Sequence, residues 1–257
     1  MQDKNRLLAV LLMKAALPLM KILVQDDPKL AHKYKDWNRT IQFEVKNDEV
    51  LACFLQFVDG QLEYFSGRHP DPQINFVFKN PSDFNALMSG GIAVPNIRGA
   101  LKNLGTLIGF LPLMLGLTLL LPNKLPKDQA GRAKKVKLLL YFISVALSQL
   151  NRAGDEDMTA FTRFQPDRIY QWSVEPDGPA AYLRICKGRT KAGKGIYTRR
   201  KPFVHMIFSS IDSAFLVLTG QIDNVEAMKK GMMVTDGSPE YGKDLASIMM
   251  KINDMLA

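Results

Sequence analysis

An internal repeat constrains this chain more than any other feature. Residues 202–222, PFVHMIFSSIDSAFLVLTGQI, repeat the pattern of residues 72–92, PQINFVFKNPSDFNALMSGGI. Each copy has a proline, three apolar residues in alternation, a polar break, an apolar helical turn and Gly-x-Ile. Alternation is typical of a half-buried strand, and apolar residues three to four apart after Ser or Asp are typical of a capped amphipathic helix. The repeat therefore predicts a unit of strand, helix cap, helix and turn.

A second pair of matching segments lies upstream of the repeat. Residues 42–45, QFEV, match residues 171–174, QWSV, and the spacing to the repeated proline is nearly the same in both. Two matched blocks in the same order indicate internal duplication. The chain of 257 residues has room for two domains of ordinary size. We therefore expect two tandem domains, at residues 1–122 and 123–257.

The composition is that of a globular protein with a basic surface. Hydrophobic residues make up 47% and charged residues 23%, and the formal net charge is +9. Such a charge attracts nucleic acid, acidic lipid headgroups or phosphorylated ligands such as acyl-CoA, or simply keeps the protein soluble. Cys53 and Cys186 lie in apolar runs without metal-ligand spacing, which is typical of free thiols in a reducing compartment.

The N-terminal segment is expected to form a buried helix. The apolar run at residues 6–24 contains Lys14 and Lys21, whereas a signal peptide has an unbroken apolar centre. Pro18 predicts a kink. The polar stretch at 25–40 is expected to be a connector. We expect a cytoplasmic protein, with association at a membrane surface left open.

Short strands separated by turn residues follow, and they predict an α+β class with antiparallel meanders. In the first copy we expect strands at 41–45, 51–57, 61–66 and 74–78, and a helix at 82–88. In the second copy we expect a leading helix at 134–151, strands at 169–174, 180–187, 194–198, 203–208 and 231–235, and helices at 213–218, 225–230 and 240–256.

Residues 104–121, LGTLIGFLPLMLGLTLLL, carry no charge over about the length of a membrane-spanning helix. Three glycines and Pro112 interrupt them, and the counterpart at 232–255 contains Asp and Lys. A helix that packs between domains or lines an apolar cavity is favoured, with a spanning helix and an interfacial anchor as alternatives. The basic run from Lys124 to Lys137 suits an anionic bilayer or a solvated linker equally well.

A basic segment lies at residues 187–201. It nearly fits the phosphate-binding loop GxxxxGK[ST], but it lacks the Ser or Thr and the following helix, so a basic hairpin turn is favoured. Nucleic-acid binding would need interleaved aromatic residues, and only Tyr197 is present, so we expect no nucleic-acid partner. The residues of this anion or membrane surface are Lys187, Arg189, Lys191, Lys194, Arg199, Arg200 and Lys201.

Signatures of catalysis are sparse. His32, His69 and His205 have no obvious partner, and the sequence contains no Gly-x-Ser-x-Gly, Cys-x-x-Cys or His-Glu-x-x-His motif. The acidic run 155–157 is more typical of a helix cap than of a metal site. We therefore expect no catalytic residue, metal or cofactor. The 13 methionines suit an adaptable apolar pocket or a Met-rich core.

Residues 170–256 resemble the sterol carrier protein type 2 lipid-binding domain family. The resemblance lies in Gln171-Trp172, in the Pro-led strand that ends at Phe208, in the helix end LTGQI at 218–222 and in AMKKGMMVTDG at 227–237. The first copy, 41–121, is similar as far as Ile92 and then departs from the pattern: its Gly-led strand is unclear and its terminal helix is far more apolar.

The resemblance implies two tandem sterol-carrier-like domains. Each would be a curved five-stranded, mostly antiparallel sheet with helices on one face and an apolar tunnel for a fatty acid, an acyl-CoA or a sterol. In the second copy the implied lining residues are Val204, Met206, Phe208, Phe215, Leu218, Ile222, Met232, Met249, Ile252 and Met255. In the first copy they are Phe76, Phe78, Phe84 and Leu87, with Leu107, Phe110 and Met114 of the apolar helix.

We therefore expect a non-enzymatic protein that binds or transfers a lipid or acyl-CoA, with peripheral contact to anionic membranes as a further possibility. An accessory or scaffold protein whose domains pack without a ligand is the alternative. An enzyme acting on a hydrophobic substrate is less favoured, because no nucleophile, base or metal set is recognisable.

Overall fold

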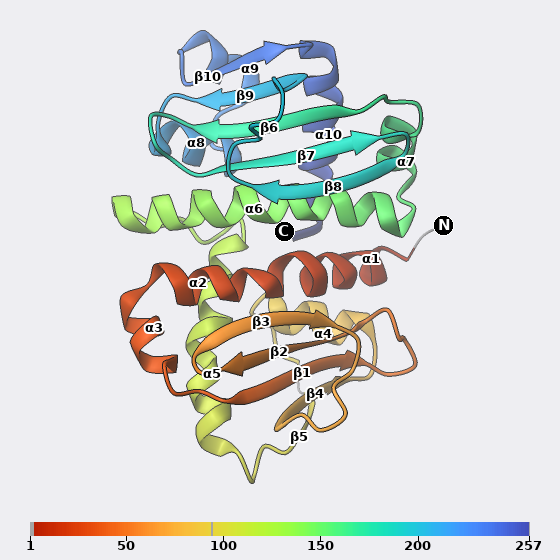
Figure 1. The fold of residues 1–257 in the computed structure, drawn as a ribbon, viewed down its shortest axis with the longest axis vertical. Coiled ribbons are helices and arrows are strands. Elements are labelled where there is room, and N and C mark those ends of the chain that lie inside the picture. The colour runs from red at the N-terminus through yellow and green to blue at the C-terminus, as the bar shows by residue number, and fades with distance from the viewer. Residues whose placement is uncertain (1–2, 94, 257) are drawn as a thin grey trace. The chain divides into compact units, whose positions relative to one another are not determined.

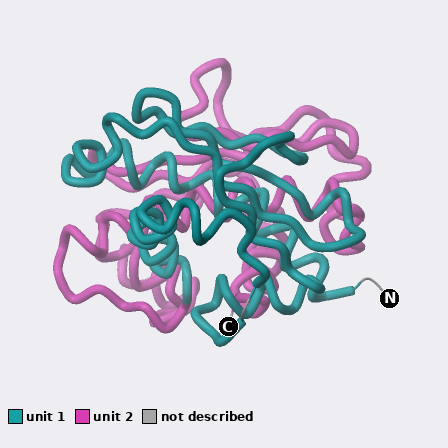
Figure 2. The backbone as a smooth tube through the Cα atoms, turned by 90° about the horizontal axis from the view of Figure 1, so that it is seen from below, with its two compact units in different colours: residues 1–121 teal, residues 122–257 magenta. Residues whose placement is uncertain are grey.

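The computed structural model describes residues 3–93 and 95–256 (Figure 1). The chain divides into two compact units, Met1–Leu121 and Pro122–Ala257 (Figure 2). Each unit contains one five-stranded sheet. In each sheet three of the four strand pairings are antiparallel and one is parallel. This confirms the predicted α+β class with mostly antiparallel sheets.

The sheet of unit 1 has the order β3-β2-β1-β4-β5. Its strands are β1 Arg39–Val45, β2 Ala52–Val58, β3 Gln61–Ser66, β4 Ile74–Phe78 and β5 Asn96–Arg98. The central strand β1 pairs with β2 antiparallel and with β4 parallel, so that Phe43 lies beside both Cys53 and Phe76. The Phe43 and Phe76 rings stack with centroids 4.9 Å apart. These apolar residues face the helices and form the core of the unit.

The helices of unit 1 are α1 Lys4–Leu11, α2 Met20–Asp26, α3 Pro28–Tyr34, α4 Pro81–Met88 and α5 Leu104–Leu117. A π-helical turn and a 3-10 turn at Leu17–Leu19 join α1 to α2. Pro18 lies in this junction, where its missing N–H and its ring disfavour regular helix. The predicted helix is therefore present and irregular at Pro18. Lys4–Asp26 is long and apolar enough to cross a membrane, but 78% of its apolar window is buried, and buried core helices pass the same test.

The sheet of unit 2 repeats this topology, with the order β10-β9-β6-β7-β8. Its strands are β6 Arg168–Val174, β7 Ala180–Cys186, β8 Arg189–Lys194, β9 Val204–Phe208 and β10 Met233–Gly237. The parallel pair β6 and β9 places Trp172 beside Met206, as Phe43 lies beside Phe76 in unit 1. The edge strand β10 continues this sheet beyond β9, as β5 continues that of unit 1 beyond β4.

The helices of unit 2 are α6 Gln129–Ala153, α7 Glu156–Arg163, α8 Ile211–Leu218, α9 Asn224–Lys229 and α10 Pro239–Leu256. Gly154 ends α6 in the left-handed conformation, with φ 77°. Asp155 then caps α7 by accepting a hydrogen bond from the Met158 N–H at 3.1 Å. The helices α6, α8 and α10 pack against the sheet from one side.

Several predicted boundaries were wrong, for local reasons. The third strand of unit 2 lies at Arg189–Lys194 and not at 194–198, because Lys187 and Gly188 both have positive φ and form a two-residue hairpin turn. The segment resembling a phosphate-binding loop is therefore mainly a strand. The connector at 25–40 contains α3, capped by Asp27 and begun by Pro28. The short elements α7 and β5 were not predicted.

Candidate functional site

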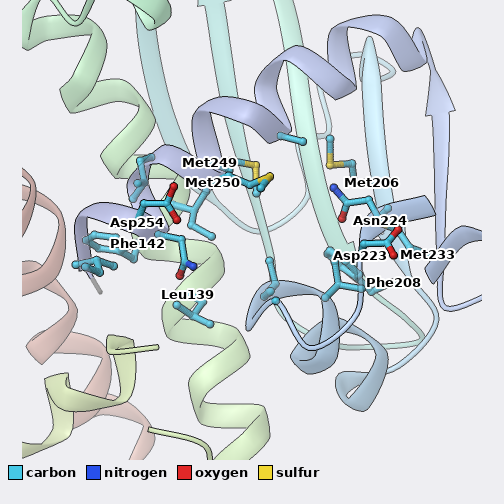
Figure 3. A pocket seen from close by; sticks show the side chains of 18 residues that line it. Leu139, Phe142, Met206, Phe208, Asp223, Asn224, Met233, Met249, Met250 and Asp254 are labelled. Atoms are coloured by element: carbon cyan, nitrogen blue, oxygen red, sulfur yellow. The ribbon is translucent and has the colours of Figure 1, made fainter. Parts of the chain in front are cut away.

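Unit 2 contains an apolar pocket of about 300 Å³ between its sheet and its helices (Figure 3). Met206, Phe208 and Met233 lie at the sheet side, and Met249 and Ile252 of α10 lie on the other side. The remaining lining residues are Leu139, Phe142, Ile143, Val217, Leu218, Gly220, Asp223, Asn224, Ala246, Met250, Asn253, Asp254 and Leu256.

Local sequence pattern explains how these side chains meet. Alternation along β9 turns Met206 and Phe208 to the same face, and the antiparallel register sets Met233 of β10 beside Phe208. On α10, Met249 and Ile252 are three residues apart and therefore share a face. Unbranched methionine side chains adapt to irregular apolar space. The pocket can therefore accept an apolar group of variable shape.

Carboxylate and amide side chains lie at the margin of this pocket. Asp223 and Asn224 come from the start of α9, and Asn253 and Asp254 come from the last turns of α10. Asp223 accepts a hydrogen bond from the Glu226 N–H at 2.9 Å and so caps α9. The wall is otherwise almost wholly apolar. This arrangement suits a ligand with an apolar body and one polar end.

Unit 1 contains a second apolar pocket, of about 500 Å³, in the topologically equivalent place. Phe76 of β4 and Ile97 of β5 lie at the sheet side, and α5 supplies most of the opposite wall. The remaining lining residues are Leu87, Met88, Gly90, Gly91, Ala93, Pro95, Leu107, Ile108, Phe110, Leu111, Met114, Leu115 and Thr118. Thr118 is the one hydroxyl side chain among the described lining residues.

Glycines in α5 allow this helix to pack closely on the rest of unit 1. A Cβ atom at Gly109 would lie 2.4 Å from the Trp37 ring, and one at Gly116 would lie 2.6 Å from Leu23. The Tyr34 hydroxyl donates a hydrogen bond to the Gly109 carbonyl at 2.8 Å. Burial raises the pKa of Tyr34 to about 12, so this donor keeps its proton at neutral pH. Gly109 and Gly116 are therefore packing positions, whereas a Cβ atom at Gly105 would meet open space.

The structure brings together some of the residues that the family resemblance implied. In unit 2 the pocket includes Met206, Phe208, Leu218, Met249 and Ile252, and in unit 1 it includes Phe76, Leu87, Leu107, Phe110 and Met114. The implied residues outside the two linings are Val204, Phe215, Ile222, Met232, Met255, Phe78 and Phe84.

Packing accounts for several of these exclusions. Phe78 and Phe84 lie in the solid core of unit 1, with ring centroids 5.2 Å apart and edge-to-face geometry. Phe215 is buried beneath the guanidinium of Arg132, which lies 5.3 Å from the ring centroid. Val204 is fully buried beside Gly242 of α10. These side chains fill space between helices and sheet instead of bordering a cavity.

Sequence reasoning missed the part of the unit 2 lining that comes from α6. Phe142 and Ile143 follow Leu139 by three and four residues, so the three side chains share one side of this helix. This spacing was visible in the sequence, but it does not say which element the helix covers. Met233 was also missed, because the strand was predicted to begin at Gly231 and its register with β9 was unknown.

The two apolar pockets offer little catalytic chemistry. None of their described lining residues is His, Cys, Lys, Arg or Ser. The structure does give His205 a partner that sequence reasoning missed, since its Nε2 lies 2.8 Å from Ser173 Oγ. Burial lowers the pKa of His205. His205 and Met206 are neighbours on β9 and point to opposite faces, so this pair lies away from the apolar pocket.

The acidic run 155–157 has structural partners. Lys251 Nζ lies 2.6 Å from a carboxylate oxygen of Asp155 and 2.7 Å from one of Asp157, and Asp155 also caps α7. Across residues 3–93 and 95–256 we find no group of three or more His, Cys, Asp or Glu arranged to hold a metal ion. The run thus joins α7 to α10.

Ion pairs partly neutralise the basic segment. Arg200 and Arg184 both bind Asp167, which lowers the pKa of that carboxyl, and Lys201 lies 3.1 Å from Asp236. Lys194 lies over the Tyr141 ring, 5.4 Å from its centroid. All seven basic side chains of this segment are exposed: Lys187, Arg189, Lys191, Lys194, Arg199, Arg200 and Lys201.

A polar cluster covers the other face of the unit 1 sheet. Glu44 accepts hydrogen bonds from Arg68 Nε at 2.6 Å and from Asn75 Nδ2 at 3.0 Å, and Gln42 Oε1 accepts one from the His69 N–H. Burial alone would raise the pKa of Glu44, but the hydrogen bonds from Asn75 and Arg68 lower it overall. The cluster explains why β4, predicted to be half-buried, is buried on both faces.

Comparison with known proteins gives partial likenesses only. No protein-family description and no curated protein matches the chain. Among solved structures, apo sterol carrier protein 2 from Yarrowia lipolytica is 15% identical, covering 39% of this chain and 92% of its own at a TM-score of 0.29. Palmitated SCP2L2 from Aedes aegypti is 14% identical, and the match covers 42% of this chain and 90% of that chain at a TM-score of 0.29. An inverting sec-alkylsulfatase from a Pseudomonas species is 15% identical, and the match covers 58% of this chain and 28% of that chain at a TM-score of 0.26.

Proposed function

We propose that each unit binds one hydrophobic ligand in its apolar pocket, without catalysing a reaction. The observation that supports this most is the equivalent place of the two pockets, each between the sheet and the last helix of its unit. Pockets of about 300 Å³ and 500 Å³ fall within the range of small-molecule sites. A packed core without a ligand function would not need such space twice.

The wall chemistry favours an acyl chain or another lipid as the ligand. Each buried methylene contributes about 0.8 kcal/mol, so ten of them would contribute roughly 8 kcal/mol before the costs of association. This requires no charged contact inside the pocket. In unit 2 the polar margin near Asn224 and Asn253 would meet a headgroup or carboxyl end. A fatty acid, an acyl-CoA and a sterol all fit this description.

The remaining parts of the proposal concern context. We propose that the two units are tandem copies of a sterol-carrier-like domain, divided near residue 122, and that each pocket forms a short tunnel when loaded. A cytoplasmic protein with these properties would carry lipid between surfaces. The exposed part of the basic segment, including Arg189 and Lys191, would add peripheral attraction to anionic headgroups or to a CoA phosphate.

Native mass spectrometry of the purified full-length chain tests the binding proposal. We expect a co-purifying lipid at one or two equivalents, identified after denaturing extraction, or the same stoichiometry after incubation with palmitate, palmitoyl-CoA or cholesterol. A chain that stays free of ligand under all these conditions would refute lipid binding and favour a packing module. Turnover of palmitoyl-CoA would instead refute the non-enzymatic part.

A further inference from the structure

Unit 1 exposes an unusually apolar surface along α5 and the segments before it. We define the apolar ridge as the exposed side chains Ile92, Leu101, Leu104, Ile108, Leu111 and Leu115. Their exposed fractions are 99%, 99%, 57%, 57%, 50% and 67% in that order. Clustered exposure of large aliphatic side chains is rare on a soluble surface and marks a site of contact with a membrane or a partner.

Helix geometry places four of these residues on one side of α5. Leu104, Ile108, Leu111 and Leu115 follow one another at intervals of four, three and four residues, so they form a continuous stripe. The opposite side of α5, at Phe110, Leu113 and Leu117, is buried in the core. The packing of α5 in the core of unit 1 therefore uses the opposite side of the helix and not this stripe.

The ridge borders the opening of the unit 1 pocket. Ile108, Leu111 and Leu115 are half or more exposed and also line the pocket, together with Gly91 and Ala93 near Ile92. An object lying on the ridge would thus lie against the pocket wall. Leu101 and Leu104 belong to the ridge but not to the lining, so the two features can be altered separately.

The chain segment that carries the ridge has charge of one sign only. From Phe84 to Lys127 the sequence contains no Asp or Glu, whereas it contains the basic residues Arg98, Lys102, Lys124 and Lys127. Lys102 is exposed and lies between Leu101 and Leu104 of the ridge. Aliphatic side chains with cations and without carboxylates match the interface of an anionic bilayer, where acyl chains lie beneath negative headgroups.

The equivalent helix of unit 2 lacks this surface. The exposed side chains of α10 are polar, for example Lys243, Asp244 and Ser247, and Met250 is the one large aliphatic residue among those that the structure describes as exposed on this helix. The carboxylates of α10 would repel anionic headgroups. A membrane contact through the last helix is therefore expected of unit 1 alone.

We propose that the apolar ridge docks unit 1 on an anionic phospholipid bilayer, with its aliphatic side chains among the upper acyl chains and Lys102 at the headgroups. The docking stands on the ridge itself, while its use for exchanging ligand with the pocket rests on the function proposed above. The stripe is about three helical turns long, so it would lie in the interface and not span the membrane.

Sedimentation with sucrose-loaded vesicles tests this proposal on the full-length chain. We expect binding to phosphatidylcholine vesicles with 30% phosphatidylglycerol to exceed binding to pure phosphatidylcholine by at least tenfold. The double variant Leu101→Glu/Leu104→Glu should weaken the former at least tenfold. Glu at position 104 begins α5 and so favours the helix dipole, which preserves folding. The matched control Phe164→Glu/Val225→Glu changes two exposed apolar residues of unit 2 in the same way and should bind as the unchanged chain does.

A single charge change tests the electrostatic part. Each lysine near an anionic surface contributes about 1 kcal/mol, so Lys102→Gln should weaken binding about fivefold at low salt and by less at high salt. Lys79→Gln, at another exposed position of unit 1, is the matched control. Equal losses in both variants, or equal binding to neutral vesicles, would overturn the anionic-surface assignment.

Two further measurements separate this proposal from the proposed function. Native mass spectrometry of Leu101→Glu/Leu104→Glu should show unchanged ligand stoichiometry, because neither residue lines the pocket. If the unchanged chain retains lipid but does not bind the anionic vesicles, docking is refuted and ligand binding stands. Light scattering that shows a dimer, converted to a monomer by the same substitutions, would identify the ridge as a protein interface and overturn the membrane assignment.

Discussion

The last helices of the two units, α5 and α10, close equivalent pockets with opposite surface chemistry. Helix α5 has no charged residue, and its exposed positions are aliphatic or glycine. Helix α10 carries Asp and Lys on its exposed side and buries Leu245, Ile248 and Ile252. The same sheet topology therefore tolerates either helix, because the fold depends only on the buried side. The exposed side is free to serve another purpose.

The two helices are also held in different ways. Close contacts at Gly109 and Gly116 and the buried Phe110 ring hold α5. An ion pair from Lys251 to the α7 cap joins α10 to its neighbour, in addition to apolar burial. We therefore expect unit 1 to respond mainly to changes in packing, and unit 2 to respond to changes in both packing and charge.

Removing a core ring from α5 should have the largest effect. Phe110→Ala deletes a fully buried side chain whose ring lies 6.1 Å from that of Phe43, and such changes cost about 3–5 kcal/mol. Its counterpart Ile252→Ala in α10 should cost about 2–5 kcal/mol. Hydrogen exchange resolved by peptide should place each loss in its own unit. Leu115→Ala, on the exposed side of α5, is the control and should cost under about 1 kcal/mol.

Filling the pockets one at a time should separate their ligands. Met114→Trp in unit 1 and Met249→Trp in unit 2 place a larger ring where a ligand chain would lie, so each should reduce the bound lipid by one equivalent. We expect affinity at the filled site to fall at least tenfold, read by native mass spectrometry. The control Met228→Trp changes an exposed methionine outside both linings. Retention of two equivalents in either pocket variant would place the ligand elsewhere.

The sequence predicted the repeated core of each unit well, because the physical signal there is local. Alternation at Ile74, Phe76 and Phe78 gave β4 with both ends correct, and alternation at Val204, Met206 and Phe208 gave β9 with its start one residue too early. Elements whose stability depends on partners were missed. The three-residue strand β5 exists because Ile97 pairs with Phe76, and no alternation precedes or follows it. The turn at Lys187-Gly188 carries no recognised sequence signal, and the strand that follows it, β8, was therefore predicted several residues too late in the chain.

The pockets were predictable only in part, for the same reason. Alternation indicates that Met206 and Phe208 share a face, but whether a buried side chain borders a cavity or fills the core depends on what packs above it. Phe84 is as apolar as Phe76, yet it meets the Phe43 and Phe78 rings and leaves no space. The contribution of Phe142 required the placement of α6, which its own periodicity does not specify.

Removing the charge that joins α10 to α7 should give a smaller loss, confined to unit 2. Lys251→Met leaves the buried Asp155 carboxylate without this partner, which we expect to cost about 1–2 kcal/mol after discounting for the 38% exposure of the Lys251 side chain. The control Lys243→Met changes an exposed lysine of the same helix. Peptides of α10 and α7 should exchange faster, and those of α5 should not change.

The sign of the pH dependence follows from the pKa of Lys251. Burial alone would lower this pKa, but the hydrogen bonds to Asp155 and Asp157 raise it overall above 10.5. A raised lysine pKa gives stability that is complete below the unfolded value and lost as pH rises through the folded value. The difference between Lys251→Met and the unchanged chain should therefore stay constant from pH 6 to pH 9. A difference that disappears within that range would contradict the ion pair.

The smallest effect is expected at the start of unit 1, where an ion pair joins a helix to a turn. Arg6 Nε lies 2.6 Å from an Asp48 carboxylate oxygen and joins α1 to the β1–β2 turn. In unit 2 a neutral contact, from Asn151 Nδ2 to the Gly188 carbonyl at 2.8 Å, joins α6 to the β7–β8 turn. The hydrogen bond from Arg6 is the main cause that lowers the pKa of Asp48 below 3.8. A lowered carboxyl pKa gives stability that is present above the unfolded value and lost as pH falls through the folded one.

Asp48→Asn should accordingly cost about 0.2–1 kcal/mol at pH 6, because the Arg6 side chain is largely exposed. Asparagine keeps an oxygen that can accept the Val50 and Leu51 N–H groups, so the turn itself should persist. Below pH 3.8 the unchanged chain loses the same contact, and the difference in unfolding free energy between the two proteins should shrink. Thermal unfolding at pH 6 and pH 3 measures it. For Asn151→Ala in unit 2, the difference in unfolding free energy from the unchanged chain should be the same at pH 6 and pH 3. If both variants showed the same pH dependence, this distinction between the units would be wrong.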